Sequence, residues 1–224
     1  SGEAWDLVPG RYRHALHVEA EQTISYPAAG VINPAQGTIE FWMQRWWDSD
    51  DEVRSIVVGF ATEADNYLRV NFVNAHRFGI AMNGGPKGAT VWHRVDYDPN
   101  AWAEGIWHHV AAVWDGGAIR LYIDGERVGG SDRNSPMVEA PAELEIGRGP
   151  VFIDDLRISD IARTADEIAE TFTGRKPGEV TLLTDLEVTD AAQALGKVGI
   201  DAQRGVDDRT MPLIAANRLY ERGV

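Results

Sequence analysis

Aromatic and basic side chains that could contact a sugar occur at two places in this chain. Trp46 and Trp47 are neighbours at the end of one apolar run, and Trp92 is followed two residues later by Arg94. Sugar rings stack their C–H bonds on aromatic faces, and a guanidinium donates several hydrogen bonds. These four residues are therefore candidate ligand-binding residues. The alternative for the tryptophans is packing in the core or at its rim, because large aromatic side chains dominate core energetics.

Residue types suited to metal binding or covalent catalysis are sparse or badly spaced. The absence of cysteine excludes disulfides, zinc–thiolate sites and cysteine nucleophiles. His108 and His109 are adjacent, so on a strand they point to opposite faces and cannot chelate one metal together. The acidic cluster Asp48–Glu52 lacks the glycine and glutamate positions of an EF-hand loop, and we expect a solvated acidic loop there. No catalytic residue is predicted.

The charge balance restricts the class of partner. Thirty-five acidic residues face twenty-one basic ones, which gives a formal net charge of -14. Such a chain repels phosphate backbones, so we expect no nucleic-acid partner. No apolar run approaches the roughly 20 residues that cross a bilayer, and no cationic leader precedes an apolar stretch. We expect no membrane insertion and no signal peptide in this sequence.

The sequence pattern of one segment predicts a β-hairpin. Residues 107–125 read WHHVAAVWDGGAIRLYIDG. Val110, Ala112 and Trp114 alternate with polar or smaller residues, and Asp115-Gly116-Gly117 separates this run from a second alternating run. A period of two bounded by Asp-Gly turns indicates two antiparallel strands.

The same pattern of short alternating runs separated by turn residues extends over most of the chain. Turn clusters of Gly, Asn, Asp and Pro separate short runs, with no helix between them, which indicates an all-β sandwich or jelly roll rather than an α/β fold. The expected strands are Ala15–Glu19, Thr23–Tyr26, Thr38–Gln44, Arg54–Ala61, Tyr67–Val73, Arg77–Met82, Thr90–Val95, His108–Trp114, Ile119–Ile123, Glu143–Gly147 and Phe152–Ile158.

A single helix follows the last of these strands. Thr164 and Glu167 have capping-box spacing, and Ile168 and Phe172 fall on one face that can pack on the sandwich. We therefore expect a β-sandwich over residues 1–174, with the helix ending near Gly174. Residues 175–224 form a mixed extension that docks on the sandwich, links to a neighbouring domain or contacts a partner.

Within that extension, Val180–Leu186 suits a strand, and Ala191–Leu195 and Leu213–Tyr220 suit helices. Pro212 is well placed to begin the second of these helices.

These segments, in this order, resemble the laminin-G-like jelly rolls of the concanavalin A-like lectin/glucanase superfamily over residues 10–173. The matching pieces are Arg13–Val18, Gly37–Met43, Gly105–Trp114, Ile119–Gly125, Ile153–Ile158 and Ala162–Ile168. The resemblance implies two packed antiparallel sheets in modules of extracellular or cell-surface proteins that bind glycans or proteins or act as spacers. It also implies that Trp42, Trp107 and Trp114 fill the core.

The resemblance also bears on calcium and on catalysis. Related sandwiches often hold one structural Ca²⁺ through an aspartate equivalent to Asp154, with capping of a turn or pairing with an arginine as the alternative. Glucanases of the superfamily carry two glutamates around an aspartate on one strand, as retaining hydrolysis requires. Glu63-Ala-Asp65 lacks the second glutamate, and Glu143-Leu-Glu145 lacks the rest of the pattern. The sequence therefore predicts a non-catalytic domain.

The expected function is a carbohydrate-binding or adhesion module of a larger secreted or surface protein of bacterial origin. Its partners would be a glycan or protein ligand and the neighbouring domains of a longer chain, and its binding groups would come from loops between strands. The alternatives are a protein–protein interaction or architectural spacer domain and, less favoured, a divergent glycoside hydrolase.

Overall fold

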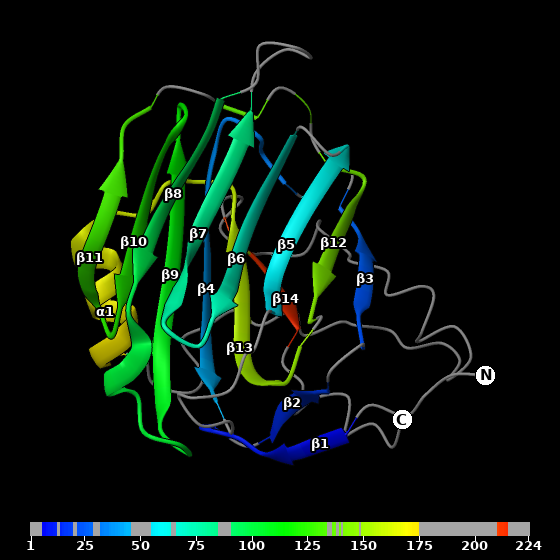
Figure 1. Ribbon diagram of the computed structural model, residues 1–224, viewed down its shortest axis with the longest axis vertical. Helices are drawn as coiled ribbons and strands as arrows, with labels where there is room; N and C mark the ends of the chain where they lie inside the picture. The colour runs from blue at the N-terminus through cyan, green and yellow to red at the C-terminus, as the bar shows by residue number, and fades with distance from the viewer. Residues whose placement is uncertain are drawn as a thin grey trace.

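The computed structural model describes residues 6–12, 14–19, 22–28, 32–45, 55–63, 66–84, 91–133, 136–137, 139, 141–147, 149–174 and 210–214. Within them the chain forms two antiparallel sheets that face each other, the arrangement expected from the sequence (Figure 1). Each sheet includes strands from distant parts of the sequence.

The first sheet has eight strands in the order β1-β2-β13-β4-β9-β10-β11, with β14 paired to β13. Its strands are β1 Asp6–Pro9, β2 His14–Val18, β4 Gln36–Gln44, β9 Trp107–Asp115, β10 Ala118–Ile123, β11 Glu126–Ser131, β13 Val151–Ser159 and β14 Thr210–Ile214. The second sheet has six strands in the order β3-β12-β5-β6-β7-β8. They are β3 Ile24–Pro27, β5 Ser55–Glu63, β6 Asn66–Asn74, β7 Arg77–Gly84, β8 Val91–Tyr97 and β12 Glu143–Ile146.

The predicted hairpin is confirmed. Gly116 and Gly117 both have positive φ angles, of 53° and 93°, and join β9 to β10 in a two-residue turn. Asp124 and Gly125 repeat this conformation between β10 and β11, at 51° and 82°. Two consecutive positive φ angles match the twist of a tight hairpin, which explains the glycines at these positions.

Alternation along the strands separates a core side from an outer side. Val110, Ala112 and Trp114 of β9 lie in the core between the sheets, while Ala111 and Val113 face the other way. The core is aliphatic and aromatic throughout, and many of its side chains are fully buried, among them Phe41, Phe60, Phe72, Phe78, Leu68, Ile80 and Leu121. Burial of this surface is the main force that holds the two sheets together.

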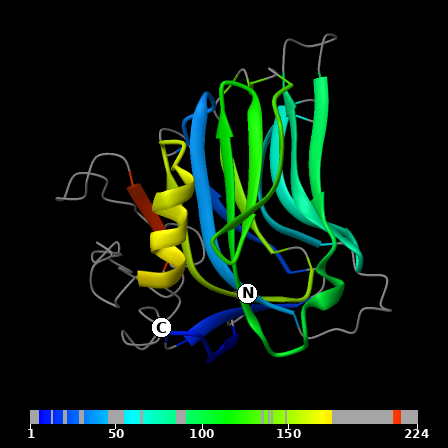
Figure 2. The same ribbon diagram turned by 90° about the vertical axis from the view of Figure 1, so that its left-hand side faces the viewer.

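Helix α1, Ala165–Gly174, lies on the outer side of the eight-stranded sheet (Figure 2). Its capping box is present: the Glu167 amide donates to Thr164 Oγ1 at 3.3 Å, and the Thr164 amide donates to Glu167 Oε2 at 2.8 Å. Ile168 packs on Ala111, Val113 and Tyr122 in a second, smaller core. The amphipathic face predicted from the sequence therefore docks where expected.

Three strands were not predicted. β1 and β11 are short pieces at the two edges of the eight-stranded sheet, and β14 falls where a helix from Leu213 was expected. β14 pairs with Leu156–Ser159 of β13, along the edge beyond the part that β2 occupies. An edge strand tolerates Pro212, so pairing with β13 overrides the helix-start signal. Of the expected helix Leu213–Tyr220, only Leu213 and Ile214 are described, and they belong to β14. The rest of that helix and the segments Val180–Leu186 and Ala191–Leu195 lie outside the described residues.

Packing between β4 and β9 yields a stability prediction. A Cβ atom added at Gly37 would lie 2.1 Å from Cζ2 of Trp114 and 2.8 Å from the Ser159 carbonyl oxygen. Gly37→Ala should therefore lower the free energy of unfolding by about 2–4 kcal/mol through overpacking. Denaturant unfolding followed by tryptophan fluorescence measures the loss.

Gly130→Ala is the matched control. Its added Cβ would meet mainly the flexible end of the Arg127 side chain, which can move away at little cost. An equal loss of stability in both variants would contradict the predicted clash in the core.

Candidate functional site

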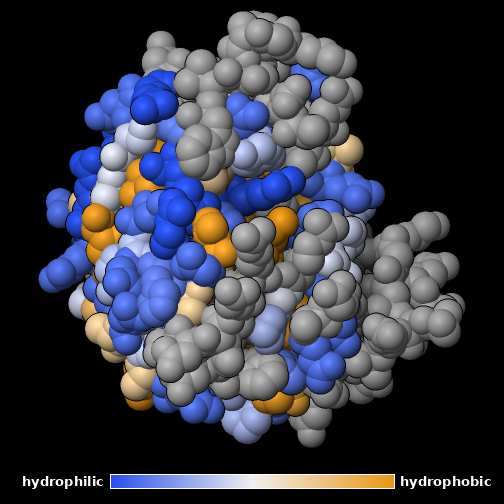
Figure 3. Space-filling view, viewed as in Figure 1, coloured by the Kyte–Doolittle hydropathy of each residue, from blue (hydrophilic) through white to orange (hydrophobic). Residues whose placement is uncertain are grey.

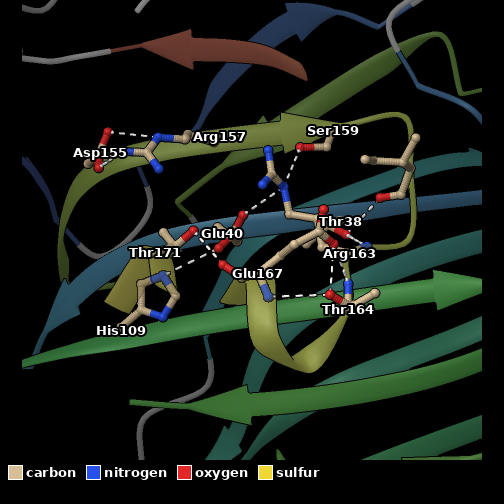
Figure 4. Close-up of polar contacts among 11 residues, drawn as sticks. Thr38, Glu40, His109, Asp155, Arg157, Ser159, Arg163, Thr164, Glu167 and Thr171 are labelled. Atoms are coloured by element: carbon tan, nitrogen blue, oxygen red, sulfur yellow. Dashed lines mark hydrogen bonds and ion pairs between the residues drawn. The ribbon is translucent and has the colours of Figure 1, made fainter. Parts of the chain in front are cut away.

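Beneath α1, the outer side of the eight-stranded sheet holds a buried group of polar side chains, here called the Glu40 cluster. Its members come from β4, β9, β13 and the helix: Thr38, Glu40, His109, Arg157, Ser159, Arg163 and Thr171 (Figure 4). Thr38 Oγ1 donates to the Ile161 carbonyl at 2.8 Å and accepts from the Arg163 amide at 2.9 Å. The cluster thus fixes the turn that leads into α1.

Glu40 is the centre of the cluster and is 2% exposed. Its carboxylate lies 3.2 Å from Arg163 Nε and 3.6 Å from His109 Nε2. Burial raises the pKa of Glu40, and the charges of Arg163 and Arg157 and a hydrogen bond from Thr171 oppose that rise. A carboxylate without cationic partners could not remain in this position.

His109 is 1% exposed and stacks between aromatic rings. Its ring centroid lies 5.2 Å from that of Trp42 and 6.1 Å from that of Phe172. Burial lowers the pKa of His109 to about 4, and the positive charge of Arg157 adds to this effect. His109 is therefore neutral near pH 7, and α1 separates it from solvent.

His108, its neighbour, points to the other side of the sheet as expected. It stacks on Trp102, with ring centroids 4.4 Å apart, and its Nδ1 lies 2.8 Å from Asp124 Oδ2. Both histidines are therefore packed, and the two cannot act on one ligand or one metal. The Glu40 cluster closes one face of the sandwich and is not a site for a ligand from solvent.

The calcium candidate Asp154 lies where β13 meets the β1–β2 loop, and it is 2% exposed. Its Oδ2 accepts a hydrogen bond from the Tyr12 amide at 3.0 Å, and the amides of Arg11 and Asp155 donate to the same carboxylate. Burial raises the pKa of Asp154 to about 6 against these hydrogen bonds. Asp154 thus anchors the loop around Gly10–Tyr12.

Calcium requires six to eight oxygen ligands, whereas the described contacts of Asp154 come from hydrogen-bond donors. The contacts made by Asp154 are N–H donors, and its neighbour Asp155 pairs with Arg157. Within the described ranges no three His, Cys, Asp or Glu side chains gather into a group that could hold a metal. Calcium at Asp154 stays an untested prediction, and the geometry favours the alternative role in a turn.

The outer side of the six-stranded sheet presents a different surface, here called the polar face. Its described residues alternate with the core residues of β12, β5, β6, β7 and β8. They are Glu143, Glu145, Ile56, Gly59, Tyr67, Arg69, Asn71, Arg77, Gly79, Ala81, Asn83, Arg94 and Asp96. Figure 3 looks onto this side and shows a largely hydrophilic surface with scattered apolar patches.

One cross-strand row of the polar face alternates long and small residues. The paired positions run Glu145, Gly59, Arg69, Ala81 and Arg94, from β12 to β8. Each arginine therefore stands beside a residue with little or no side chain. The long side chains of this row lie over the small residues, since a Cβ at Gly59 would come within 3.1 Å of Arg69 Cγ and Ala81 is 4% exposed.

Arg94, a predicted ligand residue, is committed to other protein groups. Its Nη1 donates to Asn71 Oδ1 at 2.8 Å, on the far side of β7, and its Nε contacts Asp96. Asp96 also pairs with Arg77 at 2.6 Å. Burial alone would raise the pKa of Asp96, but the hydrogen bonds and charges of these two arginines lower it. Arg94 thus links β8 to β6 across β7 and stabilises the polar face.

Tyr67 and Arg69 form the second feature of the polar face, and neither was a predicted site residue. The Arg69 guanidinium lies over the Tyr67 ring, with Cζ 4.5 Å from the centroid. A Cβ at Gly59 would come within 3.1 Å of Arg69 Cγ, so the stem of Arg69 rests against that glycine. The signal available in the sequence was their spacing of two within a strand, which puts both on one face.

The predicted aromatic residues have mixed outcomes. Trp46 and Trp47 lie outside the described residues, and Trp92 is described only by its backbone, which pairs with Asn83. Trp114 lies in the core as expected. Trp42 is also buried, but under α1, where its ring stacks on Phe172 at 5.7 Å.

Trp102 and Trp107 differ in their exposure to solvent. Trp102 is 3% exposed and packs in the core against Phe78 and Tyr97, so it is not a binding residue. Trp107 is half-buried at the start of β9.

Glu143 and Glu145 are the carboxylates nearest to a glucanase arrangement. Both point outward from β12, since Leu144 and Ile146 between and after them lie in the core. Glu63 is on β5, but its side chain lies outside the described residues, as does Asp65. The structure therefore brings together only the pair of glutamates that the sequence already showed. In the part of the chain that is described, no helix is long and apolar enough to span a membrane.

The buried histidine predicts a pH dependence of stability. Because the pKa of His109 is lowered from 6.5 to about 4, the unfolded chain takes up a proton between these values while the folded chain does not. The contribution of His109 to stability should fall by about 3 kcal/mol as the pH drops through this window. Urea unfolding at several pH values should show a flatter dependence for His109→Gln. An equally steep fall in this variant would contradict the assignment.

Removal of metal ions tests whether Asp154 binds calcium or caps a turn. Because amides already bond its carboxylate, we expect the melting temperature to be the same in EDTA and in millimolar calcium. Differential scanning fluorimetry checks this. A rise with calcium that disappears in Asp154→Asn would instead establish a calcium site.

Solved structures of similar fold include binding domains of botulinum neurotoxins. The receptor-binding domain of botulinum neurotoxin mosaic serotype C/D superposes with a TM-score of 0.62 at 12% identity, over 77% of this chain and 45% of that one. The botulinum neurotoxin DC binding domain in complex with SialylT gives a TM-score of 0.58 at 11% identity, over 75% and 44%. The same domain in complex with rat synaptotagmin II gives 0.58 at 11% identity, over 75% and 45%.

These similarities concern the fold, because the identities are low, and this chain spans less than half the length of those domains. No curated protein sequence matches the chain. A family model does: Laminin G 3, of the concanavalin A-like lectin/glucanases superfamily, matches residues 19–169. With the two-sheet architecture and the helix after β13, this match shows that the chain belongs to the concanavalin A-like lectin/glucanases superfamily.

Proposed function

We propose that this chain is a non-catalytic carbohydrate-binding module and that its ligand lies on the polar face. The observation that carries the proposal is the network of mutually fixed polar side chains there: Arg94 with Asn71 and Asp96, and Arg69 with Tyr67. Hydrogen-bonding groups held in place on a rigid sheet lose little entropy when they bind a ligand rich in hydroxyls.

The outer side of the eight-stranded sheet is less suited to a ligand than the polar face. There α1 covers the eight-stranded sheet, and the Glu40 cluster beneath it is shielded from solvent. No helix among the described residues lies on the six-stranded sheet (Figure 2). A ligand from solvent can therefore reach the polar face without displacing a helix.

The comparisons support a binding module in general terms. The toxin domains of similar fold were solved with SialylT and with synaptotagmin II, one a glycan and the other a protein. A surface made of arginine, asparagine, aspartate and tyrosine side chains favours the glycan, because these groups donate to and accept from hydroxyls. A protein ligand is the alternative that a negative glycan experiment would support.

The module would act by binding alone, within a larger secreted or cell-surface protein. Glu143 and Glu145 share a strand face without the third carboxylate and second glutamate of the glucanase pattern. We expect no release of reducing sugar from any polysaccharide that the protein binds. Such release, lost in Glu143→Gln or Glu145→Gln, would make the chain a hydrolase.

Substitution of the aromatic residue on the polar face tests the proposal. Tyr67→Ala removes the ring that supports Arg69 and should weaken binding of the best ligand on a glycan array about tenfold, since such ring contacts contribute on the order of 1 kcal/mol. Isothermal titration calorimetry with that glycan measures the change.

Ile106→Ala is a control for the loss of an accessible apolar group. Ile106 is 51% exposed and lies in the loop before β9, apart from the polar face. The proposal would be contradicted if Tyr67→Ala and Ile106→Ala both bind the glycan like wild type while Trp46→Ala or Trp47→Ala loses binding. The site would then lie at the segment that contains Trp46 and Trp47.

A further inference from the structure

We propose that the polar face selects acidic sugars, with the Arg69 guanidinium pairing with a sugar carboxylate. This inference rests on the proposed function and specifies its ligand class. Three observations together support it. The Arg69 guanidinium lies over the Tyr67 ring and has no anionic partner among the described residues. The hairpin that carries it has no acidic residue, although the protein as a whole is strongly acidic.

Arg69 differs from the other arginines of the polar face in what it contacts. Arg77 and Arg94 share the carboxylate of Asp96, and Arg94 also donates to Asn71. Across the described part of the chain, the guanidinium of Arg69 makes no hydrogen bond and no ion pair, and its contact is the Tyr67 ring. Its N–H groups are therefore available to a ligand.

The Tyr67 ring limits the positions that those N–H groups can take. A guanidinium is planar, with five N–H donors in its plane, so donors that do not face the ring can reach a ligand. Two parallel N–H groups match the two oxygens of a carboxylate, which gives a bidentate, charge-assisted pair. Tyr67 on one side and the contact with Gly59 restrict the side chain before any ligand arrives.

The positions paired with Arg69 on the neighbouring strands are Gly59 and Ala81, which carry no side chain or a single methyl group. Both positions are buried, and Asn71 Oδ1 already accepts a hydrogen bond from Arg94. A sugar would therefore meet Arg69 at the outer surface of the sheet and would not lie in a hollow between the strands.

The local charge complements an anion although the chain as a whole repels one. The β6–β7 hairpin, residues 66–84, contains Arg69 and Arg77 and no aspartate or glutamate, whereas the formal net charge of the chain is -14. The carboxylates of the polar face stand on β8 and β12, on either side of this hairpin. An acidic group would therefore be tolerated at Arg69 and disfavoured over most of the remaining surface.

The experiment compares glycans that differ only in charge. Oligogalacturonides and oligosaccharides of glucuronic acid are each measured beside their methyl esters, and sulfated oligosaccharides are included to separate carboxylate recognition from a general preference for anions. Wild type should bind at least one acid about tenfold or more tightly than its ester, as expected for a charge-assisted pair. High salt should reduce this difference.

Variants assign the preference to Arg69. Arg69→Gln should abolish the difference between acid and ester while retaining the weaker binding of the ester, and Arg69→Lys should restore part of it. Arg120→Gln is the matched control, because Arg120 lies on β10 of the other sheet and its ion pair with Asp132 is exposed. It should bind like wild type.

The outcomes separate this inference from the proposed function. Equal binding of acid and ester by wild type, a preference retained in Arg69→Gln, or tighter binding of sulfated than of carboxylated sugars would overturn the role of Arg69 and leave glycan binding intact. Absence of binding to all acidic and neutral glycans would overturn both proposals. The wild-type comparison decides the matter even if Arg69→Gln fails to fold.

Discussion

The burial of one side of every sandwich strand is the constraint on which the rest of this structure depends. Because side chains alternate along a strand, packing Val110, Ala112 and Trp114 into the core forces His109 and Ala111 outward. The same rule on β6 places Tyr67 and Arg69 on the surface when Leu68 enters the core. The chemistry on either outer face therefore follows from the register of the apolar core.

The two outer faces use polar residues for opposite purposes. Under α1, Glu40 and His109 are removed from water, and the Glu40 carboxylate lies 3.2 Å from Arg163 Nε, an arrangement that costs desolvation and contributes specificity of docking more than net stability. On the six-stranded sheet, the nearly buried side chain of Arg94 pairs with the partly exposed Asp96, and Arg69 lies over the Tyr67 ring without an anion. The first group positions a helix, and the second leaves binding groups accessible.

This division alters the usual expectation for a β-sandwich, in which loops carry the binding residues. Here the groups that support the proposed function stand on central strands, where backbone pairing on both sides limits their motion. Small residues at Gly59 and Ala81 leave room for the stems of the long side chains beside them, such as that of Arg69. Gly79 also lets β7 approach β8 closely, since an added Cβ would lie 1.9 Å from the Val95 carbonyl oxygen.

The sequence by itself determined the hairpin around Gly116 and the capping box of Thr164, because each depends on spacing within a short segment. It also determined the β-sandwich class, because short alternating runs separated by turn residues repeat along most of the chain. It did not indicate that Thr210–Ile214 would pair with β13, since an edge strand is stabilised by its partner. Nor did it show that Arg94 reaches Asn71 across β7, or that Asp154 holds the β1–β2 loop. Those contacts depend on the register between distant strands, which only the tertiary structure decides.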